Sequence, residues 1–151
     1  MEQRPWKPNV TVAALIERDG RFLLVEEETD DGLRFNQPAG HLDQGESLVA
    51  ACAREALEET AWSFRPTALI GVYQWPRPQG DITYLRFAFG GELGDHHADR
   101  KLDAGILRAV WMTPEEIRAS ADRHRSPLVW QCVADCLAGR RYPLELITHH
   151  G

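Results

Sequence analysis

The segment AGHLDQGESLVAACAREALEETAW, residues 39–62, crowds three glutamates into five positions of a predicted helix. Glu55, Glu58 and Glu59 have a single basic neighbour, Arg54. Like charges three or four residues apart on a helix each cost about a few tenths of a kcal/mol. Anions near the C-terminal end also oppose the helix dipole. The electrostatics of an isolated helix therefore disfavour these three neighbouring glutamates. Residues that a helix alone disfavours are expected at functional sites.

Helical geometry puts the three carboxylates on one stripe. At about 100° per residue, Glu58 and Glu59 fall roughly 60° and 40° to either side of Glu55. The stripe can be a solvent-exposed acidic face, which is the commonest structure for a run of charged residues. It can instead bind a hard cation such as Mg²⁺, which takes carboxylate oxygens and keeps waters that substrate phosphates can replace. The opposite side is predicted to face the sheet and carries Val49, Ala50, Ala53, Ala56 and Leu57.

Runs rich in β-branched and aromatic residues lie on both sides of this helix. Residues 10–17 and 22–28 flank the turn RDGR and predict a first hairpin. Residues 68–75 and 82–93, joined by PRPQGD, predict a second hairpin. Residues 29–40 are rich in turn formers and predict a loop.

The predicted helices separate and follow these strands. One helix is expected from about Ser47 to Thr60. Residues 106–112 predict a further strand, after which Thr113 caps a helix with proline at its first position. A last helix is expected over residues 126–138, stopped by Gly139. This order of elements predicts α+β or mixed α/β, with helices covering a mostly mixed sheet.

Length and charge narrow the possible partners. The 151 residues predict one domain, residues 1–151. A net charge of −6 disfavours nucleic-acid polymers and anionic membranes, so a polyanionic substrate would need a cation at the site. No apolar run approaches the roughly 20 residues of a membrane span, and the N-terminus MEQRPWKPN lacks the apolar core of a signal peptide. We therefore expect a cytoplasmic protein with its three cysteines reduced.

The spacing around the glutamates resembles the Nudix box, which here spans residues 40–62. Its glycine and charged positions are matched by Gly40, Glu46, Arg54, Glu55, Glu58 and Glu59. Two positions depart from the signature, because Ala61 replaces its final glycine and Trp62 its aliphatic residue. If that glycine has a positive φ, alanine costs about 1–2 kcal/mol there.

Resemblance to the Nudix hydrolases implies an α/β fold, an α/β/α sandwich in which helices flank a mixed β-sheet. It also implies catalysis with Mg²⁺, or sometimes Mn²⁺. Glu58 and Glu59 would be metal ligands, with the carbonyl of Gly40 as a third. Glu55 would be either a further ligand or the base that activates water. Bound metal would neutralise the phosphoryl oxygens and generate a nucleophile near neutral pH.

The same resemblance gives supporting roles to two further box residues. Arg54 would orient Glu55 within the catalytic group, and Glu46 would tie the loop to the helix by pairing with Arg54. Many family members add an acidic ligand from outside the box. Asp99 or Asp103 could serve here, but their segment, GDHHADRKLDAG, is more readily interpreted as a solvated loop.

Segments spread over residues 7–147, among them KPNVTVAALIERDGRFLLVEE and YQWPRP, resemble the NudJ-type phosphatase subgroup. This implies hydrolysis of nucleoside di- or triphosphates, or of hydroxymethylpyrimidine pyrophosphate, by a monomer or homodimer. The alternative is a Nudix-fold binding module that recognises a nucleotide diphosphate without cleaving it. The intact box argues against that alternative.

Several residues outside the box are candidate substrate contacts. Phe35, Tyr73 and Trp75 could stack on a base, although core packing is the commoner role of such aromatic residues. Arg34, Arg86 and Arg125 could contact phosphate, although surface or structural roles are commoner for arginine. Both interpretations remain open from the sequence.

Overall fold

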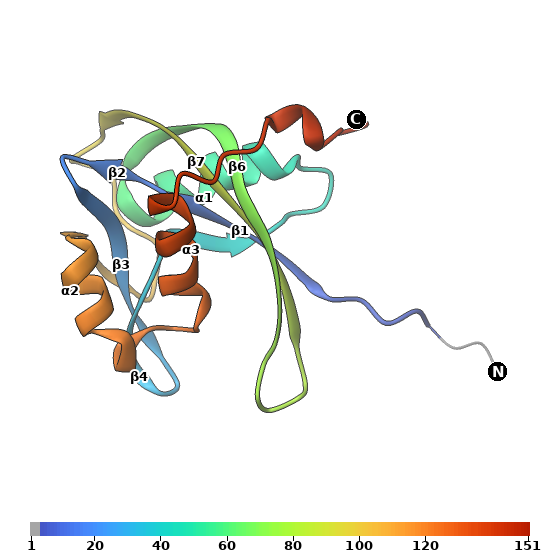
Figure 1. Ribbon diagram of the computed structural model, residues 1–151, viewed down its shortest axis with the longest axis horizontal. Coiled ribbons are helices and arrows are strands. Elements are labelled where there is room, and N and C mark those ends of the chain that lie inside the picture. The colour runs from blue at the N-terminus through green and yellow to red at the C-terminus, as the bar shows by residue number, and fades with distance from the viewer. Residues whose placement is uncertain (1–3) are drawn as a thin grey trace.

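The strands of the chain form two sheets, seen in a computed structural model that describes residues 4–151 (Figure 1). The first six strands are β1 (Asn9–Leu15), β2 (Glu17–Arg18), β3 (Arg21–Thr29), β4 (Gly32–Asn36), β5 (Ala39–His41) and β6 (Trp62–Pro76). They are followed by β7 (Thr83–His96) and β8 (Ile106–Met112). The helices are α1 (Leu48–Thr60), α2 (Pro114–Ala119) and α3 (Leu128–Leu137), with short 3₁₀ turns at Ala121–Arg123 and Leu144–Leu146.

One sheet is mixed and the other is antiparallel. In the mixed sheet the order is β5-β1-β7-β6, in which β1 and β7 run parallel and the other pairs are antiparallel. In the second sheet β3 pairs with β2, β4 and β8, always antiparallel. The short strand β5 thus lies at the edge of the mixed sheet, with β1 between it and β7.

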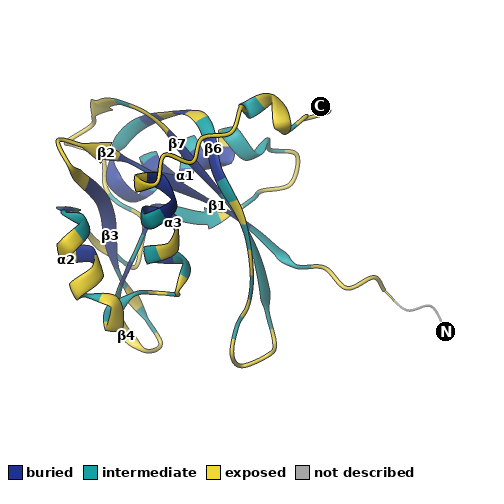
Figure 2. Cartoon of the chain, viewed as in Figure 1, coloured by how far each residue is buried: buried dark blue, intermediate teal, exposed yellow. Residues whose placement is uncertain are grey.

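Strand β1 has helices over both of its faces. Val12 and Ala14 belong to a hydrophobic cluster that includes residues of α1. Ala13 and Leu15, which point the other way, belong to a cluster that includes residues of α2 and α3. Burial on both faces explains the continuous apolar run of this strand (Figure 2). The expected α/β/α sandwich, with helices flanking a mixed sheet, is confirmed.

Two expectations about the first third of the chain need correction. Residues 10–17 and 22–28 do not form one hairpin. Only the two-residue β2 pairs with β3 across the RDGR turn, whereas β1 joins the other sheet. Residues 29–40 are not a continuous loop, because they contain β4 and β5. The turn formers of this segment are concentrated at its start, where Thr29 and Gly32 pair to close the β3–β4 hairpin.

The later elements follow the sequence predictions closely. Strands β6 and β7 form the second hairpin, which extends well beyond the body of the molecule (Figure 1). Thr113 makes a capping box with Glu116 at the start of α2, and Gly139 follows α3 with a φ of 82°. Within residues 4–151 no helix is long and apolar enough to cross a membrane.

Candidate active site

Ser47 and Ala61 cap the two ends of α1. The Ser47 hydroxyl accepts a hydrogen bond from the backbone N–H of Ala50 at 3.1 Å. Ala61 closes the helix in the left-handed conformation, with φ 64°, and donates its N–H to the carbonyl of Leu57 at 2.9 Å. The departure from the box signature therefore falls at a position of positive φ, where alanine carries strain of about 1–2 kcal/mol.

The acidic side of α1 faces into the protein. The exposed fractions of Glu55 and Glu59 are 9% and 8%, and Glu58 is partly exposed. Burying carboxylates is costly unless hydrogen bonds, opposite charge or a metal compensates. The stripe is therefore not a solvated acidic face.

The prediction for the opposite side of α1 is mostly wrong. Of the five residues expected to face the sheet, only Ala56 is buried, whereas Val49, Ala50, Ala53 and Leu57 are partly or fully exposed. The apolar residues that α1 buries are Ala51, Cys52 and Ala56. These small residues share the inward stripe with the glutamates, so one face of the helix serves both the core and the site.

Arg54 is the cation around which the carboxylates gather. Its Nε and Nη2 donate to the two carboxylate oxygens of Glu46 at 2.7 and 2.9 Å. Its Nη1 donates to both Glu55 and Glu58 at 2.9 Å. Nη2 also donates to the backbone carbonyl of His41 at 3.1 Å. The Arg54 guanidinium therefore connects α1 to the preceding loop and fixes the side chains of Glu55 and Glu58.

A carboxylate from outside the box lies beside Glu55 and Glu58. Carboxylate oxygens of Glu55, Glu58 and Asp103 lie within 4.8 Å of one another. The backbone N–H of Asp103 donates to the Glu58 carbonyl at 3.0 Å, which holds the β7–β8 connection against the end of α1. The sequence suggested Asp99 or Asp103 only as a weaker alternative to a solvated loop. The structure brings Asp103 to the cluster, and Asp99 is exposed outside it.

Gly40 leaves space that the carboxylates fill. A Cβ atom at this position would lie 2.2–2.5 Å from the carboxylate atoms of Glu55, so any side chain here would displace Glu55. The neighbouring backbone N–H of Ala39 donates to Oε1 of Glu59 at 2.9 Å. The short strand β5 thus lies directly against two glutamates of α1.

The environment changes the proton affinity of these carboxyl groups in opposite directions. Burial raises the pKa of Glu55, and burial together with nearby Glu55 and Glu27 raises the pKa of Glu59 to about 9. The hydrogen bonds from Arg54 lower the pKa of Glu46. Arg54 forms ion pairs with only part of the set Glu46, Glu55, Glu58, Glu59 and Asp103, because Glu59 and Asp103 have no ion pair among the described residues. A hard divalent cation fits such an all-oxygen set, because Mg²⁺ and Mn²⁺ prefer carboxylate and carbonyl ligands.

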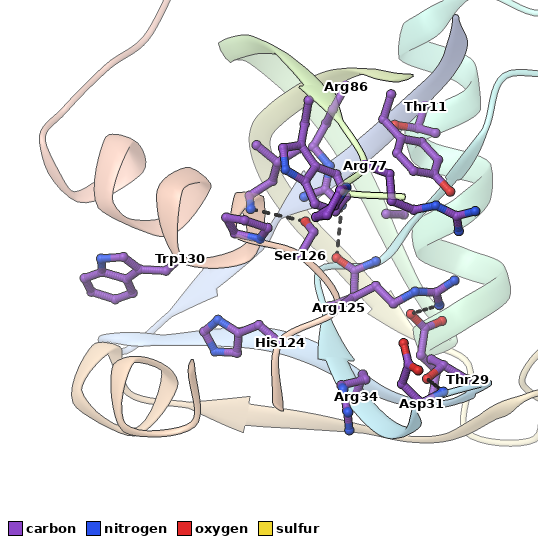
Figure 3. A pocket seen from close by; sticks show the side chains of 18 of the residues that line it. Thr11, Thr29, Asp31, Arg34, Arg77, Arg86, His124, Arg125, Ser126 and Trp130 are labelled. Atoms are coloured by element: carbon purple, nitrogen blue, oxygen red, sulfur yellow. Dashed lines mark hydrogen bonds and ion pairs between the residues drawn. The ribbon is translucent and has the colours of Figure 1, made fainter. Parts of the chain in front are cut away.

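A cavity of about 820 Å³ opens beside β5 and is lined by Ala39, Gly40 and His41. This volume suits a small-molecule ligand. Its other walls come from β4, the β6–β7 hairpin and the segment leading into α3 (Figure 3). Trp75 and Tyr84 line it from the hairpin and are stacked on each other, with ring centroids 6.1 Å apart and planes 15° apart. The cavity therefore has an aromatic wall at Trp75 and Tyr84, and at Gly40 it adjoins the carboxylate of Glu55.

Four of the six candidate substrate residues line this cavity. Arg34, Trp75, Arg86 and Arg125 do so, and Arg125 pairs with Glu27 at 2.8 Å. Tyr73 does not, and it packs against the core cluster on the α3 side. Phe35 does not line the cavity either. It is 5% exposed in the core cluster on the α3 side, with the guanidinium of Arg123 4.6 Å from its ring centroid. The commoner role that the sequence allowed for Phe35, core packing, is the one that the structure gives it.

Known proteins resemble this chain in sequence and structure. The NUDIX domain family matches residues 5–131. The protein is 42% identical to Phosphatase NudJ of Escherichia coli (strain K12), over 94% of this chain and 92% of that protein. It is 52% identical to a NUDIX hydrolase from Nitrosomonas europaea, with a TM-score of 0.92 and coverage of 95% of this chain and 98% of that one.

A more distant structure shares the fold. A bifunctional NMN adenylyltransferase/ADP ribose pyrophosphatase from Francisella tularensis has a TM-score of 0.68 at 21% identity. That likeness covers 90% of this chain and 43% of the other. The family match, the identity to NudJ and the shared fold agree with the box geometry, and the chain belongs to the Nudix family as a hydrolase.

Proposed function

We propose that the chain is a Mg²⁺-dependent pyrophosphohydrolase or phosphatase, which Mn²⁺ also supports. Its substrates would be nucleoside di- or triphosphates, or a related diphosphate such as hydroxymethylpyrimidine pyrophosphate. The similarity to Phosphatase NudJ supports a phosphate-releasing activity. In this proposal residues 1–151 act as a single catalytic domain.

The observation that carries the proposal is the approach of Glu55, Glu58 and Asp103 within 4.8 Å of one another beside Gly40. These residues, with Glu59 and the Gly40 carbonyl, would hold the cation. Glu59 is suited to this role because the described chain hydrogen-bonds only its Oε1, which leaves Oε2 for a ligand. A bound divalent ion would neutralise phosphoryl oxygens and lower the pKa of a bound water.

The remaining steps depend on the chain's own residues. Glu55 would accept the proton of the attacking water or serve as a further ligand. Burial raises the pKa of its carboxyl group, which favours proton uptake. Arg54 would keep Glu55 and Glu58 in place through its hydrogen bonds at 2.9 Å. Glu46 would in turn fix Arg54 through two hydrogen bonds.

The cavity beside β5 would hold the rest of the substrate. Trp75 presents an aromatic surface there on which a base or pyrimidine ring could stack. Arg34 and Arg86 line the same space. A ligand whose phosphates lie at Gly40 would thus have its organic group against the β6–β7 hairpin.

The test is a phosphate-release assay on a panel of nucleoside di- and triphosphates and hydroxymethylpyrimidine pyrophosphate, with Mg²⁺, with Mn²⁺ and with EDTA. Three proteins are compared: wild type, Glu58→Gln and Glu92→Gln. Glu92 is a matched control because it is an exposed glutamate paired with exposed Arg65, away from the box. We expect metal-dependent release by wild type and Glu92→Gln, and at least a hundredfold slower release by Glu58→Gln.

The same assay separates the hydrolase from a binding module. A module that recognises a nucleotide diphosphate without cleaving it would show saturable nucleotide binding and no release with either metal. Release that persists in EDTA, or that survives in Glu58→Gln, would contradict the proposed role of the carboxylate cluster.

A further inference from the structure

We propose that Arg86, which lines the cavity beside β5, binds phosphate oxygens of the substrate. This inference rests on the proposed function and adds a second anion contact to it. Arg86 lies on β7, is only 6% exposed, and lines the cavity (Figure 3). Among residues 4–151 no carboxylate forms an ion pair with it.

The partners of Arg86 within the chain are neutral. Its Nη1 donates to Oε1 of Gln37 at 2.8 Å and contacts Sγ of Cys132 at 3.8 Å. Its Nη2 donates to Oδ1 of Asn36 at 3.0 Å. A guanidinium has five N–H donors, so these contacts orient the group without using all of its donors. They also leave its positive charge uncompensated.

A nearby buried carboxylate is engaged elsewhere. Asp135 lies one helical turn from Cys132 on α3 and is 6% exposed. It accepts a hydrogen bond from the Tyr73 hydroxyl at 2.7 Å and pairs with Arg140 at 3.6 Å. It therefore does not serve as the ion-pair partner of Arg86.

Two of the other three arginines that line the cavity have carboxylate partners. Arg77 pairs with Asp81, and Arg125 pairs with Glu27 at 2.8 Å. Arg34 donates to the carbonyl of Leu33 at 2.9 Å and forms no ion pair among the described residues. Arg86 is the most buried of these arginines, and a buried charge without a counter-charge lowers stability. An incoming anion would supply that counter-charge.

The register of the mixed sheet places Arg86 within reach of a ligand bound at the box. Thr11 of β1 is the cross-strand neighbour of both His41 on β5 and Arg86 on β7. The Cα atoms of His41 and Arg86 are therefore two strand spacings apart, roughly 10 Å. Both residues line the cavity, so one nucleotide-sized ligand can contact both of them.

Phosphate is the anion that this geometry favours. A guanidinium presents paired N–H donors that match two phosphate oxygens. The net charge of −6 supplies no general attraction for polyanions, so binding must depend on local groups such as Arg86. A substrate with phosphate oxygens beyond the hydrolysed bond would satisfy both the cluster and Arg86.

The experiment measures pyrophosphate binding by titration calorimetry in EDTA, with no metal and no turnover. Wild type is compared with Arg86→Gln and with Arg77→Gln, which removes the same charge from a cavity arginine that has its own carboxylate partner. We expect the Kd of Arg86→Gln to rise at least tenfold and that of Arg77→Gln to change less than twofold. Equal affinities of wild type and Arg86→Gln, or no binding by wild type, would overturn the proposal.

A second measurement covers the case in which Arg86→Gln does not fold. Metal-free crystals of the wild type are soaked in pyrophosphate, and phosphate density within hydrogen-bonding distance of the Arg86 guanidinium supports the proposal. Density only elsewhere overturns it. Because neither measurement involves hydrolysis, their outcome is independent of whether the phosphate-release assay succeeds.

Discussion

Glu59→Gln separates the effect of the carboxylate cluster on folding stability from its effect on turnover. Glutamine retains the side-chain oxygen that accepts the Ala39 N–H at 2.9 Å, so the local fold should persist. It removes a carboxyl group whose pKa burial raises to about 9. We expect the variant to be more stable than wild type without metal, and to lose most of its turnover with metal.

The size of the stability effect follows from proton linkage. An acid with a raised pKa holds its proton more tightly in the folded state, so its stabilising contribution is complete below pH 4.5 and is lost as pH rises toward 9. Each pKa unit corresponds to about 1.4 kcal/mol, which gives an upper bound of roughly 5 kcal/mol at pH 8. Water entry and relaxation reduce this, and we expect about 2 kcal/mol, or a Tm roughly 4–8 °C higher for the variant.

The assay is thermal unfolding of wild type and Glu59→Gln at pH 5 and pH 8, each with EDTA and with Mg²⁺. Without metal the two proteins should differ mainly at pH 8. Saturating Mg²⁺ at 100 times its Kd should stabilise wild type by about 2.7 kcal/mol and the variant much less. Turnover should fall by more than the 10–100-fold typical of residues that merely support metal ligands. A variant less stable than wild type at pH 8 in EDTA, or one with normal turnover in saturating Mg²⁺, would refute this reasoning.

Three further predictions concern Gly40, Ala61 and Glu26. Gly40→Ala places a Cβ 2.2 Å from the Glu55 carboxylate, so turnover should fall at least about a hundredfold while circular dichroism shows a folded protein. Ala61→Gly relieves a φ of 64° at the end of α1 and loses one buried methyl group, so urea unfolding should show a net gain of about 0.5 kcal/mol. Ala50→Gly, in the exposed part of the same helix, should instead cost about 1 kcal/mol, and a loss of stability in both variants would contradict the argument. Ion pairs with two arginines lower the pKa of Glu26, so its contribution is present above pH 4.5 and is lost as pH falls below that value. Glu26→Gln should therefore cost about 1–2 kcal/mol at pH 7 and less at pH 4, and an equal cost at both pH values in urea unfolding would count against it.

Local signals predicted the boundaries of elements better than the directions in which their faces point. Thr113 and Gly139 mark the start of α2 and the end of α3 because capping depends on neighbouring residues alone. The inward face of α1 was mispredicted because an apolar stripe was assumed to face the sheet. The burial of Glu55 and Glu59 depends on contacts with β5, which lies in a segment that resembled a loop.

The acidic residue outside the box shows a second limit of sequence reasoning. Asp103 is more than 40 positions from Glu58, and its segment has no local pattern that distinguishes it from Asp99. Only the pairing of β8 with β3 and the hydrogen bond from the Asp103 N–H to the Glu58 carbonyl bring it to the cluster. The box residues, by contrast, lie within one loop and one helix, so their spacing alone was informative.

The central claim is that the carboxylates of α1 and Asp103 are held together to bind a divalent ion. Anomalous diffraction from a crystal soaked in Mn²⁺ tests this most directly. We predict a peak about 2.2 Å from carboxylate oxygens of Glu58 and its neighbours and from the Gly40 carbonyl. A well-ordered crystal with no peak there, and with these side chains turned apart into solvent, would contradict the account.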